Sequence, residues 1–295
     1  MIGVQSKNSY MDVLSVATLS GISYGVVLFL LASGLSFVIG LMGIVNIAHG
    51  ALFMTGAYIG LYVAKATGNL VLGGIAGALL AGIVGLLIER GFLRGLYKLQ
   101  LEQILVTFGF VYIITNVHLW IYGAWPQAAF VPSSLSGSVG IGQFSFSMFR
   151  ITIIVIGIIL CPILWWIQDR TKIGATIRAG MDDPDMVSVM GINLRPINIV
   201  AFFVGACIAG FAGVIGAYPL GGVNLQVGLD MIFLAIAVVV VGGVGSVQGA
   251  LIGALLIGIS TALAGTYFSR IAIFVPYILM VIILIFRPHG LMGRR

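Results

Sequence analysis

Charged side chains are scarce in this chain. Of its 295 residues, only 14 are Lys or Arg and 8 are Asp or Glu, while 60% are apolar. A soluble domain carries roughly a quarter of its residues as charges, because polar side chains must cover its surface. Disordered segments are also polar, and they are poor in aromatic residues. The composition therefore excludes both a soluble enzyme and a disordered chain.

The groups that carry enzyme chemistry are missing as well. The sequence has no HExxH motif, no CxxC motif and no Walker phosphate loop, so we expect no catalytic residues, no metal site and no ATPase site on this chain. Its two cysteines, Cys161 and Cys207, lie in apolar runs and are interpreted as packing thiols. Every Asp and Glu falls at a predicted span end or in a loop, with Asp230 the nearest exception. Proton-coupled carriers usually need a buried acid, so we expect the driving energy to enter from elsewhere.

Long uncharged runs occupy most of the chain. A helix needs about 20 apolar residues to cross the hydrocarbon core of a membrane. The candidate spans lie at about 12–33, 45–65, 70–88, 103–123, 150–168, 197–217, 231–268 as two pieces, and 271–286. The sequence predicts an all-α polytopic integral membrane protein with about eight transmembrane helices in a single domain over residues 1–295. The net charge of +6 does not indicate nucleic acid, because no basic face can form within such runs.

Basic residues gather in three places, which the positive-inside rule assigns to the cytoplasm. They are Arg90, Arg94 and Lys98 in one loop, Arg170, Lys172, Arg178 and Arg195 in a second, and Arg287, Arg294 and Arg295 in the tail. The C-terminus is therefore expected in the cytoplasm and Met1 outside. The uncharged loop of about 124–148 then faces the periplasm, and the alternation at 143–147 predicts a short strand there.

Residues 231–268 are too many for one transmembrane helix. At 1.5 Å per residue such a helix would be about 57 Å long, and it would place the basic tail outside. We expect a break where small residues crowd together, at Gly242, Gly243, Gly245, Ser246 and Gly249.

A faint internal repeat links this break to an earlier segment. Residues 45–52 (VNIAHGAL) resemble residues 244–251 (VGSVQGAL), and each has a polar side chain before Gly-Ala-Leu. Transporters built from repeats place Gly-interrupted helices at matching positions, where unwound backbone faces the transport pathway. We therefore predict broken, Gly-rich helices in two internal repeats, and a substrate pathway lined by Asn46, His49, Gly50, Gly242, Gly243, Gly245, Ser246 and Gln248. The alternative is that these glycines only permit close helix packing and that His49 is a satisfied interior histidine.

The loop of about 169–195 differs from the rest of the chain because it mixes charges of both signs with regularly spaced apolar residues. Ile173, Ile177 and Met181 recur every four residues, which is typical of an amphipathic helix. Asp183 before Pro184 predicts the start of a second helix, with Asp183 as its N-cap. We interpret this loop as the segment to which a soluble partner binds; the alternative is a solvated loop without a binding role.

Four segments together resemble the permease family of ABC importers for branched-chain amino acids, of the LivH type. They are Gly43-Ile44-Val45-Asn46-Ile47-Ala48-His49-Gly50 with Gly56-Ala57-Tyr58, Ile177-Arg178-Ala179 leading to Met190-Gly191-Ile192-Asn193, Val241-Gly242-Gly243-Val244-Gly245-Ser246 with Gly249-Ala250, and Arg287-Pro288-His289-Gly290-Leu291. The likeness runs through nearly the whole chain. The Asn-Ile-Ala-His-Gly segment is the most specific, whereas the Val-Gly-Gly segment is shared with sugar permeases of the ribose type.

The resemblance implies a subunit of the bacterial inner membrane that carries no cofactor itself. It implies a second, similar permease subunit, two ATPase subunits that hold ATP and Mg, and a periplasmic substrate-binding protein. It also implies that the loop of about 169–195 is the ATPase coupling segment, with Arg178, Asp182, Asp183, Asp185, Met190 and Gly191 as its candidate residues. The cargo would be branched-chain or related small amino acids. Two alternatives stay open: a permease for urea, short amides or other small solutes, and an uncoupled channel or facilitator.

Overall fold

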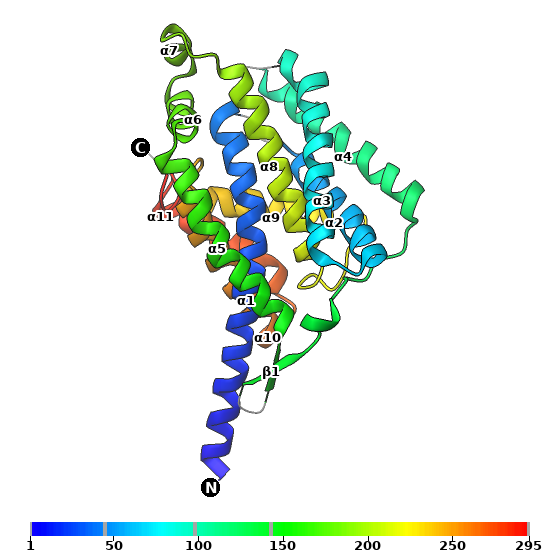
Figure 1. Ribbon diagram of the computed structural model, residues 1–295. Coiled ribbons are helices and arrows are strands. Elements are labelled where there is room, and N and C mark those ends of the chain that lie inside the picture. The colour runs from blue at the N-terminus through cyan, green and yellow to red at the C-terminus, as the bar shows by residue number, and fades with distance from the viewer. Residues whose placement is uncertain (1, 44–45, 97–98, 142–143, 294–295) are drawn as a thin grey trace.

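Helices build nearly the whole molecule in the computed structural model, which describes residues 2–43, 46–96, 99–141 and 144–293 (Figure 1). The longer helices are α1 (Ile2–Met42), α2 (Ala48–Thr67), α3 (Leu70–Ile88), α4 (Gln100–Tyr122), α5 (Met148–Arg170), α8 (Leu194–Gly216), α9 (Val227–Gly242), α10 (Val247–Tyr267) and α11 (Val275–Phe286). Two short helices, α6 (Lys172–Asp182) and α7 (Pro184–Val189), stand at one end of the molecule. Single turns of other helix types lie at Glu89–Leu93 (η1), Arg94–Leu96 (η2), Ser133–Leu135 (η3) and Ala272–Phe274 (η4).

Six stretches of the described helices are long and apolar enough to cross a membrane. They are Met11–Gly40, Leu70–Leu96, Gln100–Tyr122, Met148–Arg170, Leu194–Gly216 and Val247–Tyr267, and the shorter apolar stretches Val227–Gly242 and Ala272–Phe286 accompany them. The prediction of an all-α polytopic membrane protein is confirmed. The number of about eight crossings and the two internal repeats stay predictions.

The first helix is longer than its predicted span of 12–33. Its second half lies in the core, where the helix packs against α8, α9 and α10, while its first residues project beyond the bundle (Figure 1). Ser33 and Gly34 lie inside this helix and do not break it. The Ser33 hydroxyl donates a hydrogen bond to a carbonyl one turn earlier at 2.9 Å. Gly34 lets α8 approach, because a Cβ on Gly34 would lie 2.7 Å from the Gly205 carbonyl oxygen. Small polar residues are thus part of this buried helix.

The segment 231–268 is divided as predicted. Helix α9 ends at Gly242, and α10 begins at Val247. At about 1.5 Å per residue, the 16 residues of α9 reach only about 24 Å, which is less than the thickness of the hydrocarbon core. Two glycines between the helices, Gly243 (φ 101°) and Gly245 (φ 78°), have positive φ angles that other residues rarely adopt.

A small hairpin forms at the end of the molecule opposite α6 and α7 (Figure 1). Strand β1 (Ser138–Ile141) pairs antiparallel with β2 (Phe144–Ser147), which confirms the predicted strand. The hairpin region is tied to the α8–α9 connection by hydrogen bonds between the backbones of Gln127 and Val223 and by one from the Tyr218 hydroxyl to Ser147 Oγ at 2.9 Å. Apart from residues 142 and 143, which the structure does not describe, this loop is therefore attached to the α8–α9 connection at two points.

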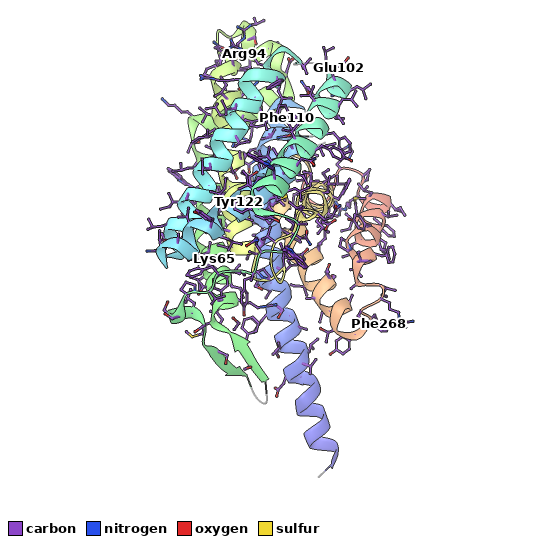
Figure 2. All side chains as sticks on the ribbon, turned by 90° about the vertical axis from the view of Figure 1, so that its right-hand side faces the viewer. Lys65, Arg94, Glu102, Phe110, Tyr122 and Phe268 are labelled. Carbon is purple, nitrogen blue, oxygen red and sulfur yellow. The ribbon has the colours of Figure 1, made fainter. Side chains whose placement is uncertain are left out.

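The described parts of the three basic clusters lie at one end of the molecule, whereas Lys98, Arg294 and Arg295 lie outside the described residues. Figure 1 places α6, α7 and the C-terminal end together at the top, and Figure 2, turned about the vertical axis, places Arg94 at the same level. Lys65 and the hairpin lie toward the other end, from which α1 starts. This arrangement agrees with the prediction that the clusters share one side of the membrane.

Candidate functional site

The break between α9 and α10 is held by side chains from two other helices. Gln168, near the end of α5, contacts it twice: its Nε2 donates to the Gly245 carbonyl, and its Oε1 accepts from the Val247 amide at 3.0 Å. The Gly245 amide donates to Ser36 Oγ on α1 at 3.0 Å. Backbone groups that a continuous helix would pair are thus satisfied by side chains, as groups buried within a membrane protein must be.

The C-terminal tail closes the other side of this break. The amides of Leu291 and Met292 donate to the carbonyls of Val241 and Gly242, at 2.8 and 2.9 Å. These carbonyls belong to the last turn of α9, where no intrahelical donor is available. Gly290 permits the approach, because a Cβ there would lie 2.6 Å from the Gly243 amide nitrogen.

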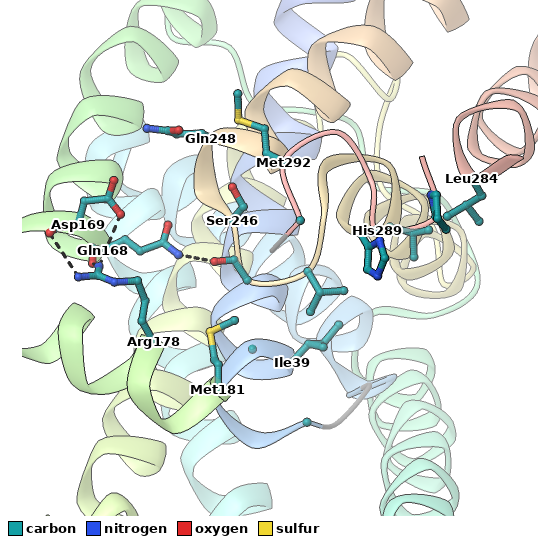
Figure 3. Close-up of a pocket in the computed structure, with 17 residues that line it drawn as sticks. Ile39, Gln168, Asp169, Arg178, Met181, Ser246, Gln248, Leu284, His289 and Met292 are labelled. Carbon is teal, nitrogen blue, oxygen red and sulfur yellow. Dashed lines mark hydrogen bonds and ion pairs between the residues drawn. The ribbon is translucent and has the colours of Figure 1, made fainter. Parts of the chain in front are cut away.

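A pocket of about 800 Å³ opens between the break, the end of α5, helix α6 and the tail (Figure 3). It brings together residues of both predicted sets, namely Gly245, Ser246 and Gln248 of the pathway and Arg178 of the coupling loop. The remaining lining residues are Ile39, Gly40, Gly43, Gln168, Asp169, Met181, Val240, Val244, Leu284, Pro288, His289, Met292 and Gly293. This pocket, here called the mouth, lies at the end of the molecule that carries α6.

The other predicted pathway residues lie apart from this pocket. Asn46 and His49 are fully buried, and His49 Nε2 contacts the Leu31 carbonyl at 3.2 Å. Both side-chain polar atoms of Asn46 lack a hydrogen-bond partner among the described residues. Gly50 packs directly against the Gly228 carbonyl of α9. The structure thus divides the predicted pathway set into a buried group and a group at the mouth.

Two of the predicted glycines, Gly242 and Gly243, lie in tight backbone contacts. A Cβ on Gly242 would overlap Gly249 of α10, and one on Gly243 would overlap Gly293 of the tail. These contacts agree with the packing alternative, which explains both glycines without a ligand.

The predicted helices of the coupling loop are present. Asp183 is the N-cap of α7, since its Oδ1 accepts from the Met186 amide at 2.9 Å. Thr171 caps α6 in the same manner, accepting from the Gly174 amide at 3.1 Å. These caps confirm that the loop folds as two short helices.

Arg178 fastens α6 to the end of α5. Its guanidinium pairs with the Asp169 carboxylate at 3.5 Å and donates to the Gln168 and Asp169 carbonyls. A cation there is stabilised by the negative end of the helix dipole. Of the other predicted coupling residues, Met190 is 71% exposed and Gly191 turns the chain with φ 79°. The side chains of Asp182 and Asp185 lie outside the described part of the structure.

Sequence reasoning missed Gln168, Met181 and the contacts of the tail. A glutamine at a span end was visible, but nothing in its neighbours indicated a partner 79 residues away. No group of three His, Cys, Asp or Glu side chains that could hold a metal occurs in the described residues.

Six long apolar helices, together with a pair of short helices at the charged end, define a multi-pass membrane protein. Its pocket lies where an interrupted helix pair meets the Arg178–Asp169 ion pair.

Comparison with known proteins identifies the family. The family model described as branched-chain amino acid transport system / permease component matches residues 17–284, and the chain belongs to this family. It is 30% identical to the high-affinity branched-chain amino acid transport system permease protein LivH of Escherichia coli K12 over 93% of this chain and 94% of that protein. It is 28% identical to the protein BraD of the same description from Pseudomonas aeruginosa, with the same coverage.

More distant likenesses exist too. A probable branched-chain amino acid transport permease protein LivH of Methanocaldococcus jannaschii is 28% identical over 92% of this chain and 90% of that protein. Among solved structures, a chain of PsaBC from Streptococcus pneumoniae in complex with Fab matches with a TM-score of 0.46 and 12% identity, covering 92% of this chain and 90% of that one. That structural likeness is too weak to bear on function.

Proposed function

We propose that this chain is the membrane-spanning permease subunit of an ABC importer that carries branched-chain amino acids across the bacterial inner membrane. The observation that carries the proposal is the family match over residues 17–284. The relatives LivH and BraD are described as permeases for the same cargo and align along nearly their whole length.

The energy for transport comes from separate ATPase subunits that bind α6 and α7 in the cytoplasm. These helices lie at one end of the molecule (Figure 1), and Met186 and Val189 of α7, with Met190 directly after it, are exposed. An exposed apolar cluster on a charged loop is suited to a protein partner. A second, similar permease subunit, two ATPase subunits and a periplasmic binding protein complete the importer, and the binding protein docks at the end that carries β1 and β2.

Within the chain, the pathway runs from the outer end past Asn46 to the pocket at the α9–α10 break. Asn46 supports this route, because a buried amide without a described partner costs free energy unless a polar ligand or water meets it. An amino acid offers both donors and acceptors to such an amide. The pocket, lined by Ser246 and Gln248, is the exit into the cytoplasm.

Reconstitution tests this function. The chain, carrying an affinity tag at its amino-terminal end, is purified with its associated subunits and incorporated into proteoliposomes with ATP in the lumen and the binding protein outside. We expect uptake of labelled leucine that requires both ATP and the binding protein. Leucine that equilibrates without ATP would indicate an uncoupled channel, and uptake of labelled urea but not leucine would indicate the other cargo class.

A further inference from the structure

Helix α6 reaches the α9–α10 break through a side chain that fits between two glycines. Met181 fills a notch made by Gly40 of α1 and Gly245 of the break. A Cβ on Gly40 would lie 2.8 Å from Met181 Sδ, and one on Gly245 would overlap Met181 Cε. Any displacement of Met181 therefore presses directly on these two backbones.

A second connection runs beside the first. Arg178 lies one turn before Met181 on the same face of α6 and donates to the Gln168 carbonyl. The Gln168 side chain in turn bonds the Gly245 carbonyl and the Val247 amide. Figure 3 shows the two routes converging on the same short segment from the side of α6.

The connection between α5 and α6 leaves α6 little freedom to move alone. Only Thr171 separates the two helices, and a Cβ on Gly174 would overlap the Gln168 carbonyl. The break, by contrast, is held mainly by hydrogen bonds to Gln168, Ser36 and the tail instead of by a continuous helix ladder. When the joined helices α5 and α6 move, the α9–α10 break is therefore the part that can change shape.

We infer that Met181 and Gln168 are the positioning residues that transmit movement of α6 to the α9–α10 break. The inference rests on the proposed function, in which the ATPases act on α6. Met181, Gln168 and Gly245 all line the pocket, so a shift of α6 alters the cytoplasmic mouth directly. Neither residue needs to touch the transported amino acid to have this effect.

The test separates ATP hydrolysis from transport. Met181→Ala empties the notch, and Gln168→Leu removes both hydrogen bonds to the break. In the reconstituted complex we expect each variant to retain copurified ATPases and ATP hydrolysis, while the leucine taken up per ATP falls at least about fivefold, the lower end of typical coupling between sites. The matched control is Met11→Ala, which makes the same deletion near the start of α1 at a residue that is 58% exposed; its leucine uptake per ATP should not change.

An unchanged leucine uptake per ATP in Met181→Ala and Gln168→Leu would overturn the inference but leave the proposed function standing. Loss of the ATPases from both variants would also overturn it, because the contacts would then serve assembly. If Gln168→Leu fails to accumulate in membranes, Met181→Ala decides the question, since it removes no hydrogen bond. Absence of ATP-dependent uptake in the unsubstituted complex would instead reject the proposed function, and the inference with it.

Discussion

Gly56 of α2 and Gly210 of α8 meet backbone to backbone. A Cβ on Gly56 would overlap the Cα and carbonyl of Gly210, so no larger side chain fits at this crossing. Lipid provides no hydrophobic driving force between helices, and their association depends on such close packing. This contact helps hold α2 against the core of the molecule.

Gly56→Leu should therefore destabilise the protein, whereas Gly109→Leu should not. Overpacking at a tight contact costs about 1–3 kcal/mol, while a Cβ on Gly109 in α4 would meet nothing within 4 Å. The measurement is the apparent melting temperature of each purified variant in detergent. Equal melting temperatures for the two variants would show that the α2–α8 crossing can widen without a loss of stability.

Asn46→Leu should raise stability and lower transport at the same time. The amide is fully buried and without a described hydrogen-bond partner, so an apolar side chain of similar size removes a desolvation penalty of about 1–3 kcal/mol. If Asn46 meets the amino acid on its way, leucine uptake should fall although the complex is intact. Melting temperature and uptake are measured on the same preparation. A stable variant with normal uptake would remove Asn46 from the pathway.

Asp183→Lys should weaken association with the ATPases, and Asp183→Asn should weaken it less. Lysine cannot accept the hydrogen bond from the Met186 amide that begins α7, a cap worth about 0.5–2 kcal/mol, whereas asparagine can. The ATPases retained on the tagged permease after washing are the measure. If Asp183→Lys retains them in full, the partner binds elsewhere. Equal losses in both variants would assign the effect to the negative charge and not to the cap.

Cysteine labelling tests the orientation. In a background with Cys161→Ser and Cys207→Ser, Met190→Cys in the coupling loop should react with an impermeant maleimide only after the cells are opened. Ser134→Cys in the outer loop, which is also exposed, should react in intact cells. Labelling of Met190→Cys from outside would reverse the topology and place α6 and α7 where no ATPase can reach them.

The sequence predicted those features that follow from local chemistry or from length. The break in 231–268 follows from the membrane thickness, and the start of α7 follows from Asp183 and Pro184. The contacts that hold the break were not predictable in the same way. Gln168 and Gly245 are brought together only by the packing of α5 against α1 and α10, and a methionine in a notch looks like any other apolar residue.

The repeat between residues 45–52 and 244–251 was the weakest guide to the site. It predicted that Asn46 and Ser246 line one passage, but it did not show that Asn46 is buried in the bundle whereas Ser246 lines the pocket. Helices begin within both segments, at Ala48 and Val247, but the internal repeats themselves stay a prediction.

The docked tail affects how the protein can be handled. Residues 290–292 lie against the end of α9, and Met292 and Gly293 line the pocket, so a domain fused behind them would lie beside the opening that we propose as the cytoplasmic exit. Fluorescent proteins, purification handles and surface tethers therefore belong on α1, whose free end is at the far side of the molecule. If a fusion at the carboxyl terminus abolishes transport, we therefore expect the fused domain to block the pocket and the permease itself to be correctly folded.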